Sequence, residues 1–203
     1  MGELTQVENW GLPSVVVPVP ENYEQEERKR RLTDLVWAHV PKHLIGRTMN
    51  DGFRPLLTKF DWTSSFVLLG PTGSGKSTAC VHLVAELLKR GKVNGGKDYE
   101  FARSIFWTRA DVITKAGGSD EDEAAKLLHR AEWSRLMILD DIATPSKTLL
   151  GVIQQRYDRG RPMIVTSGAL NPKGFSELVG GEAVTRWILE CGGKRKGDWL
   201  KAK

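Results

Sequence analysis

The chain has 203 residues, which is enough for one α/β domain with a sizeable core and too few for a second full domain. Hydrophobic residues make up 40% and charged residues 27%, an ordinary balance for a globular protein, and no apolar run approaches the roughly 18 residues that would span a bilayer. The net charge of +5 favours an anionic partner, for which nucleic acid is a candidate.

Residues 1–40 are expected to form an N-terminal arm and a short helix, with a possible contact to a partner. Three of the nine prolines stand in the first 20 residues, and residues 21–40 combine acidic and basic side chains with a short apolar stripe. The basic run Arg28–Arg31 is typical of a solvated helix face, with phosphate contact as the alternative. Two glutamates among the first eight residues argue against a secretory signal, so the sequence predicts a cytoplasmic protein.

The stretch from Phe66 to Thr78 carries the strongest signal in the chain. Phe66–Leu69 are four consecutive apolar residues, which indicates a strand buried on both faces of a parallel sheet. The pattern GxxxxGK[ST] then follows at every fixed position, in Gly70, Pro71, Thr72, Gly73, Ser74, Gly75, Lys76 and Ser77, with Thr78 next. A glycine turn without a ligand is the alternative interpretation.

The residue types in this motif suit a phosphate-binding loop. Its three glycines allow the positive φ angles and the close backbone approach that aim several N–H groups at one anion. Lys76 would reach the β- and γ-phosphates of ATP, and Ser77 would bind Mg²⁺. The helix that follows points its positive end at the same phosphates, and we expect it to end at Gly91.

Further along the chain, expected strands and helices alternate until a pair of aspartates. Ser104–Trp107 is an expected strand, Ala110–Thr114 begin a helix, and an acidic helix is expected over about residues 120–132. Leu136–Leu139 is another continuous apolar strand, and Asp140 and Asp141 follow it directly.

The two aspartates are expected beside the phosphate-binding loop, because parallel strands end at one edge of a sheet and ligands collect there. Asp140 would hold Mg²⁺, directly or through water. Asp141 would orient or deprotonate the attacking water, since phosphoryl transfer depends mainly on positioning and charge compensation. The alternative is that both acids merely open a polar loop.

The next strand places two hydroxyl groups at the same edge. Leu149–Tyr157 is an expected helix and Met163–Val165 an expected strand, with Thr166 and Ser167 at its end. These hydroxyls would sense the γ-phosphate or the attacking water, or they would cap the turn. The alternation of elements predicts an α/β fold, a three-layer αβα sandwich with a mostly parallel sheet.

Four segments in order, GPTGSGKST, RLMILDDIA, RYDRGRPMIVTSGAL and GEAVTRWILECGG, resemble the AAA+ P-loop ATPases, specifically the DnaC/IstB group of helicase loaders and transposition helper ATPases. The resemblance implies an ATPase core over residues 41–193 that is active in an assembly. It also implies that Arg186 is an arginine finger acting on a neighbouring subunit, with Arg156 and Arg159 as rivals.

The chain departs from this group at several points. Gly168 stands where the group usually has a sensor asparagine, so by resemblance the sensing passes to Thr166 or Ser167. Little chain remains after Arg186, so the helical lid of the group is expected to be missing or vestigial.

Residues 194–203 are expected to form a basic C-terminal tail, either solvated or in contact with single-stranded nucleic acid. The basic residues of this segment are Lys194, Arg195, Lys196, Lys201 and Lys203. Cys80 and Cys191 are too few and too far apart in the sequence for a disulfide framework or a zinc site, which suits a reducing compartment.

These observations suggest an ATP-hydrolysing, Mg²⁺-dependent factor of DNA metabolism that binds ATP and ADP, forms homo-oligomers on single-stranded DNA and acts with a replicative helicase. The resemblance leaves open a transposition helper that assembles on duplex DNA with a transposase. A small-molecule kinase would use the same loop, but the chain after Ser167 offers no insertion for an arginine-rich lid. A nucleotide-gated binding module with slow hydrolysis is a further alternative, because Asp141 is shorter than the glutamate usual in the group.

Overall fold

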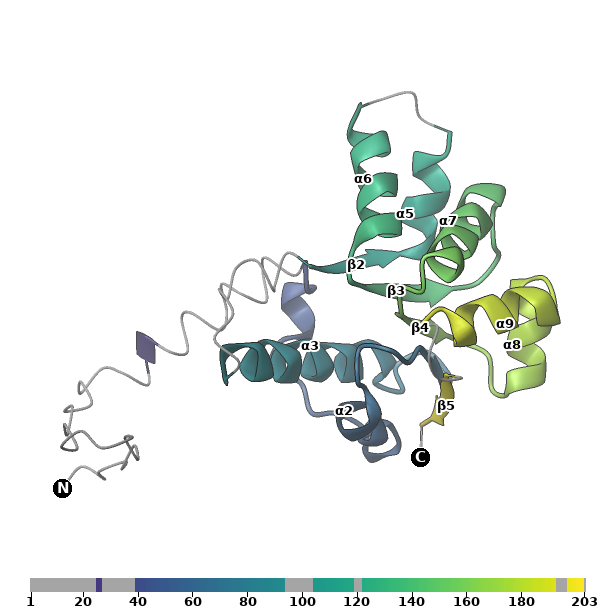
Figure 1. The fold of residues 1–203 in the computed structure, drawn as a ribbon. Helices are drawn as coiled ribbons and strands as arrows, with labels where there is room; N and C mark the ends of the chain where they lie inside the picture. Colours follow the sequence, from purple (N-terminus) through teal and green to yellow (C-terminus); the bar gives the residue numbers. More distant parts are fainter. Residues whose placement is uncertain (1–24, 27–38, 94–103, 119–121, 193–196, 203) are drawn as a thin grey trace, which may run out of the picture. The chain divides into compact units, whose positions relative to one another are not determined.

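The computed structural model of the chain describes residues 25–26, 39–93, 104–118, 122–192 and 197–202 (Figure 1). The chain divides into two units between residues 33 and 34, and the sheet with all its helices belongs to the second unit. The expected N-terminal arm, the Arg28–Arg31 run, and Lys194, Arg195, Lys196 and Lys203 lie outside the described residues.

The described residues contain five strands that form one sheet in the order β2-β3-β4-β1-β5. They are β1 (Phe66–Leu69), β2 (Ile105–Arg109), β3 (Leu136–Ile142), β4 (Met163–Ser167) and β5 (Asp198–Lys201). Every neighbouring pair is parallel, so the sheet is parallel throughout. This confirms the predicted α/β class and brings the carboxyl ends of the strands to one edge.

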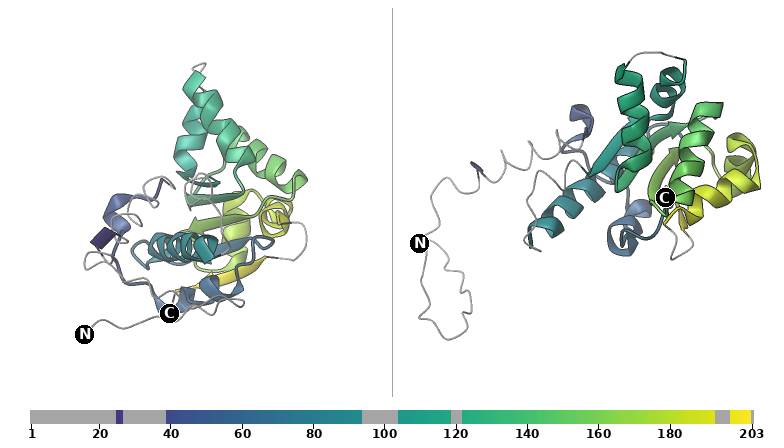
Figure 2. Two further views of the ribbon diagram at one scale, coloured as in Figure 1. Left: turned by 60° about the vertical axis from the view of Figure 1, so that its left-hand side comes forward. Right: turned by 45° about the horizontal axis from the view of Figure 1, so that its top comes forward.

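Helices cover both faces of the sheet and complete the predicted three layers (Figures 1 and 2). On one face lie α2 (Pro55–Lys59) and α3 (Lys76–Val93), preceded by the short 3₁₀ helices η1 (Lys42–Leu44) and η2 (Asp51–Phe53). On the other lie α5 (Ala110–Ala116), α6 (Asp122–Trp133), α7 (Lys147–Asp158), α8 (Pro172–Val179) and α9 (Glu182–Glu190). No helix in the described part of the chain is long and apolar enough to cross a membrane.

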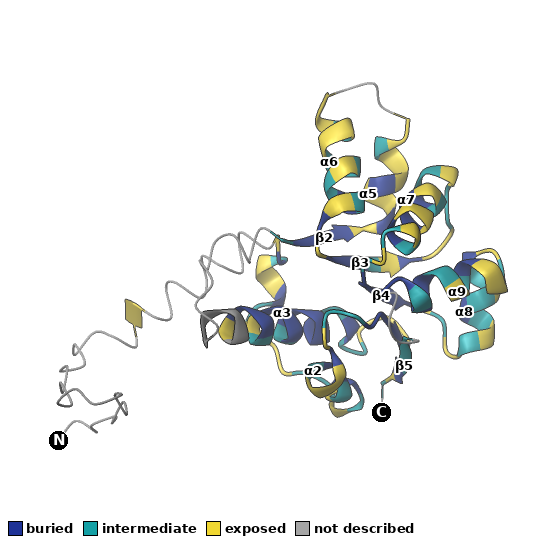
Figure 3. Ribbon diagram, in the orientation of Figure 1, coloured by how far each residue is buried: buried dark blue, intermediate teal, exposed yellow. Residues whose placement is uncertain are grey.

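β1 and the first residues of β3 and β4 are apolar without alternation, because each face of the sheet packs against a helical layer there (Figure 3). In β1, Phe66 and Leu68 belong to the core on the α3 side, whereas Val67 and Leu69 belong to the core on the α7 and α9 side. All four side chains are at most 2% exposed. The continuous apolar run that predicted β1 therefore reflects two cores that share one strand.

Three predicted element boundaries are wrong. The helix after the phosphate-binding loop does not end at Gly91 but continues to Val93, because one glycine costs a helix only about 1 kcal/mol. The helix expected to reach Val40 does not include His39 and Val40, since His39 lies in a turn with φ of 60°. The second strand extends two residues beyond Trp107, as far as Arg109.

Residues 198–201, which the sequence assigned to the basic tail, form β5. This strand lies beside β1, with Phe66 in register with Asp198. Leu200 is buried at 6% exposure, and the Asp198 carboxylate accepts a hydrogen bond from Lys59 Nζ at 2.7 Å. The signal for this strand in the sequence is weak because β5 is an edge strand of four residues, in which Lys201 and Asp198 are polar.

Arg156 is wholly buried and ties α7 to the segments that lead into β3 and β4. Its Nη1 donates to Ala131 O at 2.7 Å and to the carbonyl and hydroxyl oxygens of Ser134, both at 3.1 Å, and its Nη2 donates to Pro162 O at 2.6 Å. Burial lowers the pKa of Arg156 to about 9, so the guanidinium stays charged at neutral pH. A side chain in this position faces neither a neighbouring subunit nor DNA, which removes Arg156 as a rival of Arg186.

Replacing Arg156 with Met should lower the free energy of unfolding by about 2 kcal/mol or more, because the buried carbonyl groups of Ala131 and Ser134 lose the guanidinium as donor and each such loss costs about 1–3 kcal/mol, whereas Pro162 O keeps the Met137 N–H. Urea unfolding followed by far-UV circular dichroism measures the change. The matched control is Arg186→Met on exposed α9, for which we expect a change within about 0.5 kcal/mol. Equal stability of the two variants would contradict the role given to Arg156.

Candidate active site

The phosphate-binding loop connects the end of β1 to the start of α3 at the carboxyl edge of the sheet. Gly70, Gly73 and Gly75 all have positive φ, at 151°, 81° and 88°, as the motif predicts. A Cβ on Gly70 would lie 2.8 Å from Ser74 Oγ, whereas one on Gly73 would meet no atom within 4 Å. The positive φ favours glycine at both positions, and a side chain at Gly70 would in addition displace the Ser74 hydroxyl.

Lys76 is buried inside this loop. Its Nζ donates to Gly70 O at 2.7 Å and to Pro71 O at 2.9 Å, and it lies 3.4 Å from Ser74 Oγ. Burial lowers the pKa of Lys76, while the charges of Asp141 and Asp140 act in the opposite direction. Although Lys76 begins α3, it is only 8% exposed.

The other residues of the motif differ in exposure. Pro71, Thr72 and Gly73 are exposed at the tip of the loop, whereas Thr78 is buried in the first turn of α3. The loop is anchored to the segment that follows β4, because the Gly70 N–H donates to Ala169 O at 3.1 Å. Pro71, Thr72 and Gly73 therefore mark the side of the loop that is open to solvent.

Asp140, in β3, connects the start of α3 to β4 at the carboxyl edge of the sheet. Its Oδ1 accepts hydrogen bonds from Ser77 Oγ at 2.8 Å and from Thr166 Oγ1 at 2.6 Å. Three residues that the sequence singled out independently, from α3, β3 and β4, thus meet at one carboxylate oxygen. The expectation that Asp140 and Asp141 merely open a polar loop does not account for this convergence.

Asp141 is placed by a bulge in β3. Leu139 pairs with Val165 and Ile142 with Ser167, so Asp140 and Asp141 together lie opposite the single residue Thr166. Asp141 has φ of 60°, and its N–H donates to Thr166 Oγ1 at 2.8 Å. Left-handed backbone of this kind in a residue other than glycine is a local strain that clusters at functional sites.

The side chain of Asp141 points outward and meets an arginine that the sequence did not identify. Asp141 is 64% exposed, and its Oδ2 lies 3.6 Å from Arg109 Nη2. Arg109 is the last residue of β2 and also donates to Asp111 Oδ1 at 3.0 Å, a bond that raises the pKa of Arg109. Its position could have been found from the edge rule, had the predicted strand not ended at Trp107.

Thr166 and Ser167 have different surroundings, although the sequence treated them alike. Thr166 is 1% exposed and contacts both aspartates through its hydroxyl. Ser167 Oγ donates to Ile142 O at 3.2 Å and accepts from the Ala169 N–H at 3.3 Å. The Ser167 hydroxyl thus stabilises the chain reversal after β4, and Thr166 is the hydroxyl that lies in the site.

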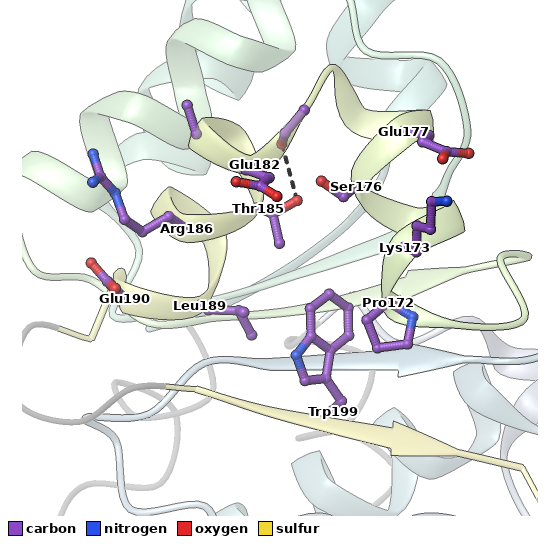
Figure 4. A pocket seen from close by; sticks show the side chains of 12 residues that line it. Pro172, Lys173, Ser176, Glu177, Glu182, Thr185, Arg186, Leu189, Glu190 and Trp199 are labelled. Carbon is purple, nitrogen blue, oxygen red and sulfur yellow. Dashed lines mark hydrogen bonds between the residues drawn. The ribbon is translucent and has the colours of Figure 1, made fainter.

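Arg186 is exposed on α9 and does not join this group. It lines a cavity of about 840 Å³ between α8, α9 and β5, which contains no residue of the phosphate-binding loop (Figure 4). Figure 4 shows Arg186 and Glu190 on one side of the cavity and Trp199 with Pro172 at its floor. Arg159, the remaining rival, is half-buried, with its guanidinium 4.4 Å from the ring centroid of Trp133.

The donor set at Asp140 suits a hard cation only in part. A hydroxyl and a carboxylate oxygen are ligands that Mg²⁺ accepts, and Mg²⁺ in nucleotide sites takes its other ligands from phosphates and water. Consistent with this, no cluster of three or more His, Cys, Asp or Glu side chains that could hold a metal exists among the residues the structure describes. Ser77 and Asp140 therefore fit a cation that arrives with a nucleotide.

Two solved structures resemble the fold. The crystal structure of the DnaC helicase loader matches with a TM-score of 0.50 and 16% identity, over 83% of this chain and 99% of that one. The crystal structure of DnaI matches with a TM-score of 0.53 and 13% identity, over 83% of this chain and 90% of that one. The chain has the fold of the DnaC-type AAA+ P-loop ATPases, and the low identity limits this finding to the fold.

Sequence comparison adds one local match. Protein RecA 2 of Myxococcus xanthus is 32% identical over 84 residues, which are 37% of this chain and 24% of the relative. The chain therefore spans about a quarter of the length of the curated relative that it matches. No model of a known protein family matches the chain.

Replacing Lys76 with Ala should weaken ATP binding by about 10- to 100-fold, because a charge-assisted hydrogen bond contributes about 1.5–3 kcal/mol. Titration of a fluorescent ATP analogue measures the affinity, and a melting curve checks that the variant is folded. Lys173→Ala, at an exposed lysine of α8, is the control and should bind as the original chain does. Normal affinity in a folded Lys76→Ala protein would show that this loop does not hold the nucleotide.

Replacing Asp141 with Asn should leave ATP binding intact and lower hydrolysis by about 100-fold or more, since the amide keeps the size of the side chain but cannot accept a proton from water. Phosphate release under saturating ATP measures this. Asp111→Asn is a matched control, because Asp111 is another exposed carboxylate paired with Arg109. Unchanged turnover in Asp141→Asn, or an equal loss in both variants, would assign the water to another residue.

Proposed function

We propose that the protein binds and hydrolyses ATP and serves DNA metabolism as a DnaC-like loader of a replicative helicase, assembled on single-stranded DNA. The observation that carries the ATPase part is the meeting of Ser77 and Thr166 at one oxygen of Asp140 beside the phosphate-binding loop. The helicase-loader part is supported by the likeness in fold to the DnaC helicase loader. We place the ATPase core at residues 41–201, because β5 belongs to the sheet.

ATP would be held by its phosphates. Backbone N–H groups of the loop and the positive end of α3, both at the carboxyl edge of the sheet, would bind the triphosphate. Lys76 would exchange its hydrogen bonds to Gly70 O and Pro71 O for phosphate oxygens, which carry full charges. Mg²⁺, held by Ser77 and Asp140, supplies charge compensation at the phosphates when it is bound.

Asp141 and Thr166 would act on the attacking water. The exposed carboxylate of Asp141 accepts a hydrogen bond from a water and sets its direction toward the γ-phosphate. Thr166 links the two aspartates, since it donates to Asp140 and accepts from the Asp141 N–H. A change in the position of Asp140 on nucleotide binding would therefore be transmitted through Thr166 to Asp141.

Hydrolysis would also require a neighbouring subunit. Arg186 is exposed and lies outside the group of residues around Asp140, so it is available to the γ-phosphate of a second copy rather than of its own chain. A guanidinium placed there compensates the charge that develops during transfer, and such a residue can contribute orders of magnitude to the rate. The functional unit is thus an assembly of at least two copies.

Arg186→Ala should bind ATP normally and hydrolyse it slowly, and mixing should restore part of the activity. Arg186→Ala keeps an intact loop and Lys76→Ala keeps an intact arginine, so some interfaces in a mixed assembly unite the intact half of each. Phosphate release from mixtures at several ratios, in the presence of single-stranded DNA, measures the rescue. Light scattering in the same samples establishes that mixed assemblies form.

Mixtures that assemble but stay as inactive as either variant alone would refute the arginine finger. The controls are Arg186→Ala alone and Lys76→Ala alone at the same total protein concentration. If Arg159 rather than Arg186 acts across the interface, Arg159→Ala alone should be slow, and a mixture of it with Lys76→Ala should recover instead.

A further inference from the structure

The amino-terminal edge of the sheet carries a basic and aromatic surface that the proposed ATPase site does not use. We call it the basic edge, and it consists of His129, Arg130, Trp133, Arg135, Arg159 and Arg161, at the end of α6 and before the starts of β3 and β4. The seven residues of β3 separate it from the phosphate-binding loop, which at about 3.3 Å per residue is roughly 20 Å. It is therefore a separate surface (Figure 1).

Aromatic rings hold the arginines of the basic edge. The guanidinium carbon of Arg135 lies 4.4 Å from the ring centroid of Trp62, and that of Arg130 lies 5.1 Å from the centroid of Phe106. The ring of Trp133 holds two further guanidinium groups, with Arg159 at 4.4 Å and Arg161 at 5.4 Å. A ring restrains a guanidinium without cancelling its charge, so these contacts build a fixed positive surface.

Trp133 adds a flat apolar surface to this charge. It is 46% exposed, one of the few large hydrophobic residues exposed in the described part of the chain. His129, one turn earlier on α6, stacks on it with a centroid distance of 5.7 Å and an interplanar angle of 20°. Exposed, stacked rings beside arginines are the type of surface on which unpaired nucleic-acid bases stack.

A cavity of about 800 Å³ opens at the basic edge. It is lined by every member of the edge except Arg159, together with Lys126, Ser104, Ala125 and Ser134. None of these lining residues, all within the described ranges, is acidic. Two of the basic side chains here are paired with carboxylates, since Lys126 Nζ lies 2.9 Å from Glu123 and Arg159 Nη1 lies 3.9 Å from Glu132. The cavity is therefore suited to an anionic chain.

The basic edge offers both positive charge and aromatic rings for stacking, and this combination distinguishes between the possible anionic ligands. An acidic peptide would satisfy the arginines but offers no planar group for the rings of His129 and Trp133. A DNA duplex offers phosphates but keeps its bases stacked and paired. A single strand offers both phosphates and free base faces.

We propose that the basic edge is a binding site for single-stranded DNA, in which Arg135, Arg161 and Lys126 contact phosphates and a base stacks beside His129 and Trp133. The proposal relies on the proposed function for DNA as the polymer, and it goes further in assigning the contact to the sheet edge opposite the ATPase site. One domain can then hold ATP and DNA at the same time, because the two ligands occupy opposite edges.

Fluorescence anisotropy of a labelled 20-nucleotide oligo(dT) tests this with the full chain. Arg135→Glu should weaken binding at least about 10-fold, and the slope of log K against log salt should fall by about 0.7 for each phosphate that the protein no longer neutralises. Trp133→Ala should weaken binding by about 5- to 100-fold, because a base can no longer stack there. Lys173→Glu on α8 carries a comparable change of charge and should bind like the original chain. ATP hydrolysis without DNA should be the same in all four proteins.

Equal affinity of the original chain, Arg135→Glu and Trp133→Ala for the oligonucleotide would overturn the proposal, and so would the absence of any binding by the original chain. ATP hydrolysis measured in parallel reports on the proposed function separately, since loss of DNA binding with normal hydrolysis leaves the ATPase part standing. Tighter binding of a duplex than of the single strand, with the same sensitivity to Arg135→Glu, would overturn the single-strand assignment.

Discussion

The common direction of the five strands is the constraint on which the candidate site depends. Because β1, β3 and β4 all run the same way, Gly70, Asp140 and Thr166 stand at one edge although they are far apart in the sequence. The edge is fixed from both faces, since β1, β3 and β4 contribute buried side chains to the cores on both sides of the sheet. The hydrogen bonds of Ser77 and Thr166 to Asp140 are then a consequence of topology, and the bulge at Asp141 is the local adjustment that separates the two carboxylates.

The two edges of the sheet have opposite chemistry. The carboxyl edge combines the glycine-rich loop with two acids, as a site for a nucleotide and a cation requires. The amino edge combines arginines with exposed rings and has no acidic residue among the described residues that line its cavity. Buried Arg156 holds the end of α6 and the start of β4 in place through Ala131, Ser134 and Pro162, and so supports the surface that we assign to DNA.

The pattern of apolar residues and the spacing of the loop motif were enough to predict the central strands and the position of the candidate site. Continuous apolar runs located β1, β3 and β4, and the loop motif with the edge rule predicted that Ser77 and Asp140 lie together. Features that depend on tertiary packing could not be predicted. The Lys59–Asp198 pair and the burial of Leu200 make β5 a strand. Arg156 lies inside the protein because it donates hydrogen bonds to carbonyl groups from separate segments of the chain. Thr166 and Ser167 differ in role because their hydroxyl groups have different hydrogen-bond partners.

The central claim, that the Asp140 edge is a Mg²⁺-dependent ATPase site, is tested most directly by single-turnover release of phosphate from γ-labelled ATP. The original chain and Asp140→Asn are compared across a magnesium titration. We predict that release by the original chain rises with Mg²⁺, and that Asp140→Asn, which keeps a hydrogen-bonding oxygen but loses the charge, requires far more Mg²⁺ or releases no phosphate. Superimposable magnesium curves for the two proteins would contradict the claim.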